Sequence, residues 1–208
     1  MSGKHFDKAA AGWDQKQRRL ELAAKIAAAI SSTLPLHKKM SALEYGCGTG
    51  LVGLALAPQL ATLTAVDTSS GMLAELARKI ESAGISNVTP LQLDLLQESL
   101  MDRYDLIFCA MTLHHIKEAD QVLTRFCDLL KDGGYLAVAD LKEEDGSFHD
   151  ATADGVMHHG FNPEYLVKTL TASGLKEVAV KEVHSIMKTN EAGVERAYPV
   201  ILVTGKKG

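Results

Sequence analysis

The stretch LEYGCGTGLVG, from Leu43 to Gly53, joins a short apolar segment to a helical pattern through a glycine-rich turn. Glycine lets the backbone adopt positive φ angles without a Cβ penalty and lets it approach a ligand closely. The helix that begins after the turn offers free N–H groups and a partial positive charge. This order of strand, turn and helix predicts a ligand site at the carboxyl edge of an open α/β sheet, where nucleotide-like molecules bind.

Apolar runs alternate with helical patterns on both sides of this turn. We expect strands over residues 40–45, 61–66, 88–93, 104–109 and 135–139, and helices over 15–32, 50–57, 70–83, 118–131 and 163–173. Such alternation predicts βαβ units and a parallel sheet with helices on both faces. Two long strand-like runs, 175–187 and 197–204, close the chain, and their linker is too short for a helical crossover. We therefore expect this last pair to be antiparallel.

Composition and charge exclude several classes of protein. The chain has 208 residues, 46% of them apolar, which fits one domain with a sizeable core and excludes a disordered chain. A net charge of −4 gives none of the broad positive field of a general nucleic-acid binder. Three widely separated cysteines without a CxxC pair argue against a disulfide framework and indicate a reducing cytoplasm. No apolar stretch approaches the roughly 20 residues that a bilayer requires, so we expect a soluble chain.

The hexamer Gly48–Gly53 matches the GxGxxG fingerprint of dinucleotide-binding proteins, so an NAD(P)-dependent oxidoreductase is one interpretation. A tight turn that needs glycines only for packing is another. No tyrosine in the chain is followed by a lysine four residues later, so the catalytic pair of short-chain reductases is absent. We also expect no second domain that would hold a hydride acceptor.

The wider pattern Glu44-x-Gly46-x-Gly48-x-Gly50 resembles motif I, (D/E)xGxGxG, of the class I S-adenosylmethionine-dependent methyltransferases. The resemblance extends along most of the chain, through Val66-Asp67, LQLDLL around Asp94, YDLIFCAMTLHHI and LLKDGGYLAVAD. It implies a Rossmann-like sheet of seven mostly parallel strands in the order 3-2-1-4-5-7-6. Its last strand is antiparallel, and helices cover both faces.

The resemblance also implies roles for individual residues. Asp67 would bind both ribose hydroxyls, because one carboxylate offers two acceptor oxygens to a vicinal diol. Asp94 would bond the adenine amino group while Leu95 covers the ring, and Glu44 would hold the turn or reach the methionyl amine. The implied cofactor-binding set is Glu44, Gly46, Cys47, Gly48, Gly50, Asp67, Thr68, Met72, Asp94, Leu95, Cys109, Ala110 and Trp13.

The N-terminal segment FDKAAAGWD resembles the FDxxAxxYD opening of small-molecule methyltransferases of the quinone-biosynthesis-like branch (methyltransferase type 11/12), with Trp13 where that branch often has tyrosine. We expect this segment to fold over the cofactor as a lid; the alternative is a frayed terminus. In the helix that follows, Lys16, Arg18 and Arg19 are expected on the outer face, with the alanine-rich face docked on the sheet.

Two groups of histidines are candidates for the acceptor side. His114 and His115 follow the fourth strand, and we weigh a structural role against acceptor binding or catalysis, with His114 slightly favoured for the latter. The aperiodic stretch 140–162 is expected to cross the acceptor side, with His149, His159 and Phe161 as substrate contacts. The histidine spacings there form no ligand pattern, so we expect no metal.

Taken together, residues 1–208 are predicted to form a single class I methyltransferase domain with an N-terminal lid and helix (1–35) and an acceptor-side loop (140–162). The expected reaction is methyl transfer from S-adenosylmethionine to a small molecule by in-line displacement. The alternatives are an oxidoreductase and a non-catalytic S-adenosylmethionine-binding protein. We expect no nucleic-acid or membrane partner, since the (N/D)PP(Y/F) motif of amino-methylating enzymes is also absent; a homodimer is compatible with these features.

Overall fold

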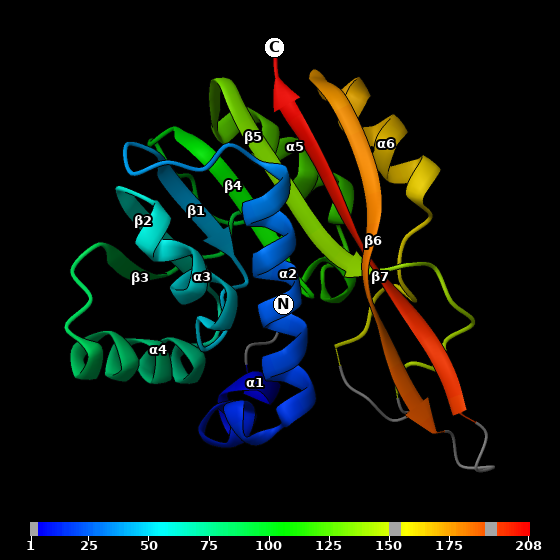
Figure 1. The fold of residues 1–208 in the computed structure, drawn as a ribbon, viewed down its shortest axis with the longest axis horizontal. Coiled ribbons are helices and arrows are strands. Elements are labelled where there is room, and N and C mark those ends of the chain that lie inside the picture. Colours follow the sequence, from blue (N-terminus) through cyan, green and yellow to red (C-terminus); the bar gives the residue numbers. More distant parts are fainter. Residues whose placement is uncertain (1–3, 150–154, 190–194) are drawn as a thin grey trace.

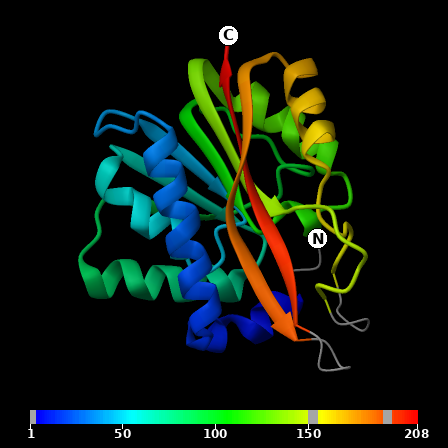
Figure 2. The same ribbon diagram turned by 45° about the vertical axis from the view of Figure 1, so that its right-hand side comes forward.

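The computed structural model describes residues 4–149, 155–189 and 195–208. Its centre is a seven-stranded sheet in the order β3-β2-β1-β4-β5-β7-β6 (Figures 1 and 2), which confirms the predicted order. The strands are β1 (Ser41–Tyr45), β2 (Thr62–Asp67), β3 (Val88–Gln92), β4 (Tyr104–Ala110), β5 (Leu130–Leu141), β6 (Leu175–Thr189) and β7 (Glu195–Lys207). Strands β1 to β5 pair in parallel, and β7 is antiparallel to both β5 and β6, as expected.

Helices cover both faces of the sheet (Figure 1). One face carries α2 (Gln17–Thr33), α3 (Leu51–Leu56) and α4 (Ser70–Ala83), and the other carries α5 (Ala119–Leu129) and α6 (Pro163–Ala172). Strand residues alternate between the two cores, as the period of two requires: Leu106 and Phe108 belong to one cluster, Ile107 and Cys109 to the other. No helix among these described segments is long and apolar enough to cross a membrane.

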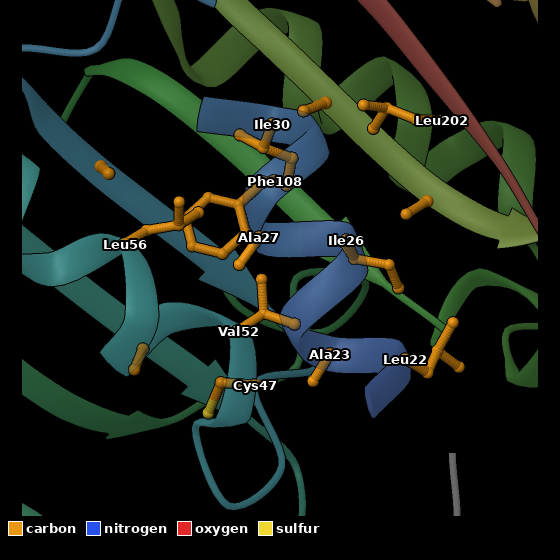
Figure 3. Close-up of a cluster of buried hydrophobic side chains, with 14 of the residues drawn as sticks. Leu22, Ala23, Ile26, Ala27, Ile30, Cys47, Val52, Leu56, Phe108 and Leu202 are labelled. Atoms are coloured by element: carbon orange, nitrogen blue, oxygen red, sulfur yellow. The ribbon is translucent and has the colours of Figure 1, made fainter. Parts of the chain in front are cut away.

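Helix α2 packs along the first of these faces with its small and branched side chains. Figure 3 shows Ala23 and Ala27 on the side of α2 that faces α3 and Phe108 of β4, whereas Ile26 points away from α3. The alanines let the helix lie close to α3, so the N-terminal part of α2 comes near the glycine-rich turn that precedes α3.

Local signals in the sequence set several helix ends. The Ser69 hydroxyl oxygen accepts a hydrogen bond from the Met72 N–H at the start of α4, and Gly84 ends this helix with a left-handed φ of 63°. Asn162 caps α6 through bonds from the Glu164 and Tyr165 N–H groups, with Pro163 in the first helical position, as predicted.

Two parts of the fold differ from the prediction. Strand β5 begins at Leu130 rather than at residue 135, because the chain pairs Leu130 with Tyr104 before the register shifts at the Asp132-Gly133-Gly134 turn. The segment before α2 is helical, with α1 (Lys4–Ala9) and the 3₁₀ helix η1 (Ala10–Gln15). It is docked against α4, so the frayed alternative does not hold for the described residues.

Candidate functional site

A cavity of about 150 Å³ lies at the carboxyl ends of β1, β2 and β4, beneath α1, η1 and the start of α2. Ten of the predicted site residues lie on its wall: Trp13, Glu44, Gly46, Cys47, Gly48, Asp67, Thr68, Met72, Ala110 and His115. Eight others lie outside this lining: Gly50, Asp94, Leu95, Cys109, His114, His149, His159 and Phe161. The wall is completed by residues that were not predicted as site residues, among them Phe6, Arg19, Ile26, Met111 and Thr112.

The glycine-rich turn between β1 and α3 forms one wall of this cavity. Gly46 and Gly48 have φ angles of 70° and 53°, in the left-handed region that favours glycine. A Cβ built on Gly46 would lie only 2.1 Å from a Thr112 side-chain atom, so this position packs against the exit of β4. A Cβ on Gly48 would meet no atom closer than 4.0 Å. The backbone at Gly48 is therefore open to a ligand.

Asp67, at the end of β2, is held by backbone donors. Its two carboxylate oxygens accept hydrogen bonds from the Gly48 N–H at 2.8 Å and from the Ser69 N–H at 2.9 Å. Burial raises the pKa of Asp67 above its ordinary value. Each oxygen still has a lone pair for a second donor. The carboxylate is thus fixed in orientation and can accept hydrogen bonds from two neighbouring hydroxyl groups.

Glu44 presents an unusual buried carboxyl group on the same wall. The residue is 2% exposed, and its Oε2 makes no hydrogen bond within the described part of the chain. Burial, opposed by a backbone hydrogen bond from Gly53 and aided by the charge of Asp67, raises the pKa of Glu44 to about 8. A buried acceptor without a donor is costly, and a cation beside it would both supply the donor and restore the ionised form.

Two aspartates attach the N-terminal segment to the rim of the cavity. Asp7 accepts hydrogen bonds from the Ser69 hydroxyl at 2.6 Å and from the Gly71 N–H at 2.8 Å, and these bonds lower its pKa. Asp14 accepts a bond from the Thr49 hydroxyl at 2.6 Å and forms an ion pair with Lys79 of α4. Neither role was predicted from the sequence, although both carboxylates belong to the motif FDKAAAGWD.

Arg19 contradicts the prediction that it lies on the outer face of its helix. Its guanidinium lies 3.5 Å from the centre of the Trp13 ring and donates to the Trp13 carbonyl oxygen at 3.1 Å. The residue lines the cavity, and its side chain is the single cation among the lining residues. Cation–π stacking on Trp13 therefore draws this charge inward, a contact that helical periodicity does not reveal.

The two adjacent histidines have different environments. His114 is 2% exposed, and its Nδ1 lies 2.6 Å from Asp140 Oδ1, while its backbone N–H donates to Oδ2 of the same carboxylate at 3.2 Å. Although burial opposes ionisation of Asp140, the His114 ring and the N–H donors hold its pKa below the ordinary value. His115 lies on the cavity wall, with Nδ1 2.8 Å from the Gly155 carbonyl oxygen and its ring 5.2 Å from that of Phe6.

The predicted acceptor-side residues lie farther from the cavity. The His149 ring lies 5.1 Å from that of His114 and 5.7 Å from that of His115. Phe161 is buried in the core beneath α6, and His159 is exposed, 3.8 Å from Glu144. Their roles in acceptor binding stay predictions. In the residues that the structure describes, no group of three or more His, Cys, Asp or Glu side chains is placed to hold a metal ion.

Asp94 and its neighbour lie behind the cavity wall. Asp94 accepts bonds from the Leu96 N–H at 3.0 Å and from the hydroxyl of Tyr45, itself a lining residue, at 3.4 Å. Leu95 packs into the core with Tyr45, and so does Cys109, whose thiol pKa burial raises well above the ordinary value. The adenine-binding role of Asp94 and Leu95 and the carbonyl role of Cys109 stay predictions.

The family model described as "Methyltransferase domain" matches residues 42–134, from β1 into the first part of β5. This match, the strand order and the glycine-rich turn identify the chain as a member of the class I S-adenosylmethionine-dependent methyltransferases.

The chain is also similar to individual relatives and solved structures. An uncharacterized methyltransferase of Schizosaccharomyces pombe is 32% identical over 156 residues, which cover 68% of this chain and 55% of that protein. The DhpI–SAH complex aligns with a TM-score of 0.74 and 22% identity over 97% of this chain and 93% of that one. Magnesium protoporphyrin IX methyltransferase (ChlM) from Synechocystis with bound SAM aligns with a TM-score of 0.66 and 19% identity, over 92% of this chain and 80% of that one. The chain spans about half the length, or less, of the curated relatives that it matches.

Proposed function

We propose that this chain binds S-adenosylmethionine in the cavity and transfers its methyl group to a small-molecule acceptor. The observation that carries the proposal is the pair of carboxyl groups on one wall: Asp67, fixed by two backbone donors, and Glu44, buried with an unsatisfied oxygen. A vicinal diol and an ammonium group are the chemical partners that these two arrangements suit, and the cofactor carries both.

The residues on the wall can be assigned to the parts of the cofactor by chemistry. Asp67 would accept from the ribose hydroxyls, and the carboxyl group of Glu44 would accept from the methionyl ammonium. Arg19 would pair with the carboxylate of the same amino-acid end, because it is the cation of the lining. When bound, the cofactor supplies a methyl group already activated by its sulfonium sulfur. The protein's own task is then to orient the acceptor in line and to exclude water.

The N-terminal segment would supply that exclusion. The bonds of Asp7 and Asp14 hold α1 and η1 over the rim of the cavity, and Phe6 and Trp13 place two aromatic rings on its wall. We assign residues 1–35 the role of lid and helix and residues 140–162 that of the acceptor-side loop, within one domain of 208 residues.

A small molecule is the proposed acceptor rather than a nucleic acid, because the net charge of −4 would repel a phosphate backbone. Cys47, Cys109 and Cys127 are buried free thiols, in keeping with the proposed reducing cytoplasm. A homodimer is a separate proposal, and the molecular mass of the protein in solution tests it.

Calorimetric titration with S-adenosylhomocysteine, the demethylated cofactor, tests this proposal. Wild type should bind it, and Asp67→Asn should weaken binding by about 1.5–3 kcal/mol, the scale of hydrogen bonds to a charged group. Asp132→Asn, an exposed position at the opposite edge of the sheet, serves as the control and should bind like wild type. Equal affinity of Asp67→Asn and wild type would contradict the assignment. Binding without transfer to any member of a panel of phenols, amines and thiols would favour the non-catalytic alternative.

A further inference from the structure

We propose that His115 is the general base of the reaction and that the methyl acceptor is a hydroxyl compound with an apolar body. The inference rests on the proposed function and specifies its substrate class. It stands on the placement of the His115 ring between a carbonyl oxygen and the cavity.

The bond to Gly155 fixes the tautomer of this histidine. A carbonyl oxygen only accepts, so the contact of 2.8 Å requires that Nδ1 carries the proton. In the neutral ring Nε2 then keeps its lone pair. Nε2 is not among the buried atoms without a partner and makes no hydrogen bond to any residue in the described ranges, so it is not fully buried, and the residue lines the cavity. A base with a free lone pair therefore faces the site.

The ring is also held in its neutral form and in its position. Burial and the neighbouring His114 lower the pKa of His115 to about 4, with His149 acting in the same direction and Asp140 against it. Asp140 fixes the backbone and ring of His114 in the preceding position, and the Phe6 ring packs edge-on against His115. His114 and Asp140 are thus positioning residues, because they act through the turn that carries His115.

Among neutral oxygen, sulfur and nitrogen acceptors, a hydroxyl group is the one that most needs such a base. At neutral pH carboxylates are ionised, thiols ionise readily, and a neutral amine attacks with its own lone pair, whereas a hydroxyl group is a weak nucleophile until its proton leaves. A lone pair of the acceptor oxygen forms the new O–C bond, and the C–S bond breaks with its electron pair going to sulfur. The O–H proton passes to Nε2 of His115 and then to solvent. The oxygen becomes strongly acidic as the O–C bond forms, because it then carries both the new methyl group and its proton. Even a weakly basic imidazole can therefore accept this proton.

The rest of the wall indicates the body of this acceptor. Phe6, Trp13, Ile26 and Met111 add two aromatic and two aliphatic side chains, and the lining cation Arg19 is stacked on Trp13. Such a surface favours a flat or aliphatic apolar group over a sugar or a peptide. Phenol is therefore the simplest probe of the class.

The test compares wild type with His115→Asn, whose amide can still donate to the Gly155 carbonyl oxygen but has no basic nitrogen. Transfer of a labelled methyl group to phenol, thiophenol and aniline is measured, and S-adenosylhomocysteine binding is measured on the same proteins.

We expect wild type to transfer the methyl group to phenol. His115→Asn should have a 10²- to 10⁴-fold lower kcat and an unchanged affinity for S-adenosylhomocysteine. His184→Asn, on the edge strand β6, is the matched control and should behave like wild type. Nitrogen NMR of the imidazole, assigned by its loss in His115→Asn, should show a proton on Nδ1 and none on Nε2 at pH 7.

Several results would overturn the inference. Phenol turnover by His115→Asn within threefold of wild type would be one such result, and a proton on Nε2 at pH 7 would be another. The same holds for transfer to thiophenol or aniline without transfer to phenol. It also holds for a wild-type protein that binds S-adenosylhomocysteine and transfers no methyl group to phenol. Failure of wild type to bind S-adenosylhomocysteine is a different result, because it refutes the proposed function itself.

Discussion

The buried carboxyl group of Glu44 gives the sharpest prediction, because its ionisation links stability, pH and cofactor binding. Its pKa rises from 4.5 in the unfolded chain to about 8 in the folded protein. This shift makes ionisation roughly 5 kcal/mol more costly in the folded state. Since the pKa of Glu44 is higher in the folded state than in the unfolded state, the contribution of this group to stability is largest below pH 4.5. That contribution is lost progressively as the pH rises to 8.

The substitution Glu44→Gln removes the titration while keeping the shape of the side chain. The difference in the free energy of unfolding, Glu44→Gln minus wild type, should rise with pH. The rise should be roughly 3 kcal/mol between pH 4.5 and pH 7, and the total rise from acid pH to above pH 9 roughly 5 kcal/mol. Urea denaturation across this range measures the difference. Glu81→Gln, at an exposed position on α4, is the control and should keep the pH slope of wild type. Parallel stability curves for wild type and Glu44→Gln would refute the reasoning.

The same group predicts a proton release on binding. With a pKa of about 8, Glu44 is about nine-tenths protonated at pH 7, and pairing with an ammonium group requires the ionised form. Titrations with S-adenosylhomocysteine in buffers of different ionisation enthalpy should therefore show close to one more proton released by wild type than by Glu44→Gln. An equal count for the two proteins would mean that Glu44 does not receive the cofactor amine.

Three further substitutions test the architecture of the site. Gly46→Ala should destabilise the protein by at least about 1 kcal/mol more than Gly84→Ala in urea denaturation. Both glycines have positive φ, but only at Gly46 would the new Cβ meet Thr112. Equal losses of stability would contradict the packing described. Asp140→Ala should cost about 3–5 kcal/mol of stability, since it removes one partner of a buried pair, and a loss below 1 kcal/mol would show that the pair is not a stabilising unit. Asp7→Ala should speed trypsin cleavage within the first sixteen residues without exposing the sheet, because it removes two bonds that hold α1 to α4; an unchanged cleavage rate would show that these bonds do not hold the segment.

Much of the fold could be predicted because local pattern and tertiary structure agree. Strands such as β4 are buried on both faces and read as continuous apolar runs, so their alternation with amphipathic helices indicated a parallel sheet. The early start of β5 could not be seen, because the polar residues Lys131 and Asp132 interrupt the apolar run, although Leu130 before them pairs with Tyr104 of β4.

The site was predictable where the backbone sets the geometry and less so where side chains choose between neighbours. The positive φ angles of the glycines and the strand-end place of Asp67 follow from the turn itself. Arg19 was expected to face solvent because helical patterning treats charge as an outward signal, whereas a guanidinium can stack on an indole ring. His114 and His115 were indistinguishable in sequence, and only the η3 turn (Leu113–His115) shows which ring meets Asp140 and which meets the cavity.

We infer that the cavity binds an adenosyl sulfonium and not a dinucleotide. Thermal unfolding of one preparation in the presence of S-adenosylhomocysteine and, separately, NADH tests it most directly. A ligand at a hundredfold excess over its Kd adds about 2.7 kcal/mol of stability. We predict a clear rise in melting temperature with S-adenosylhomocysteine and none with NADH. A rise with NADH alone would contradict the account.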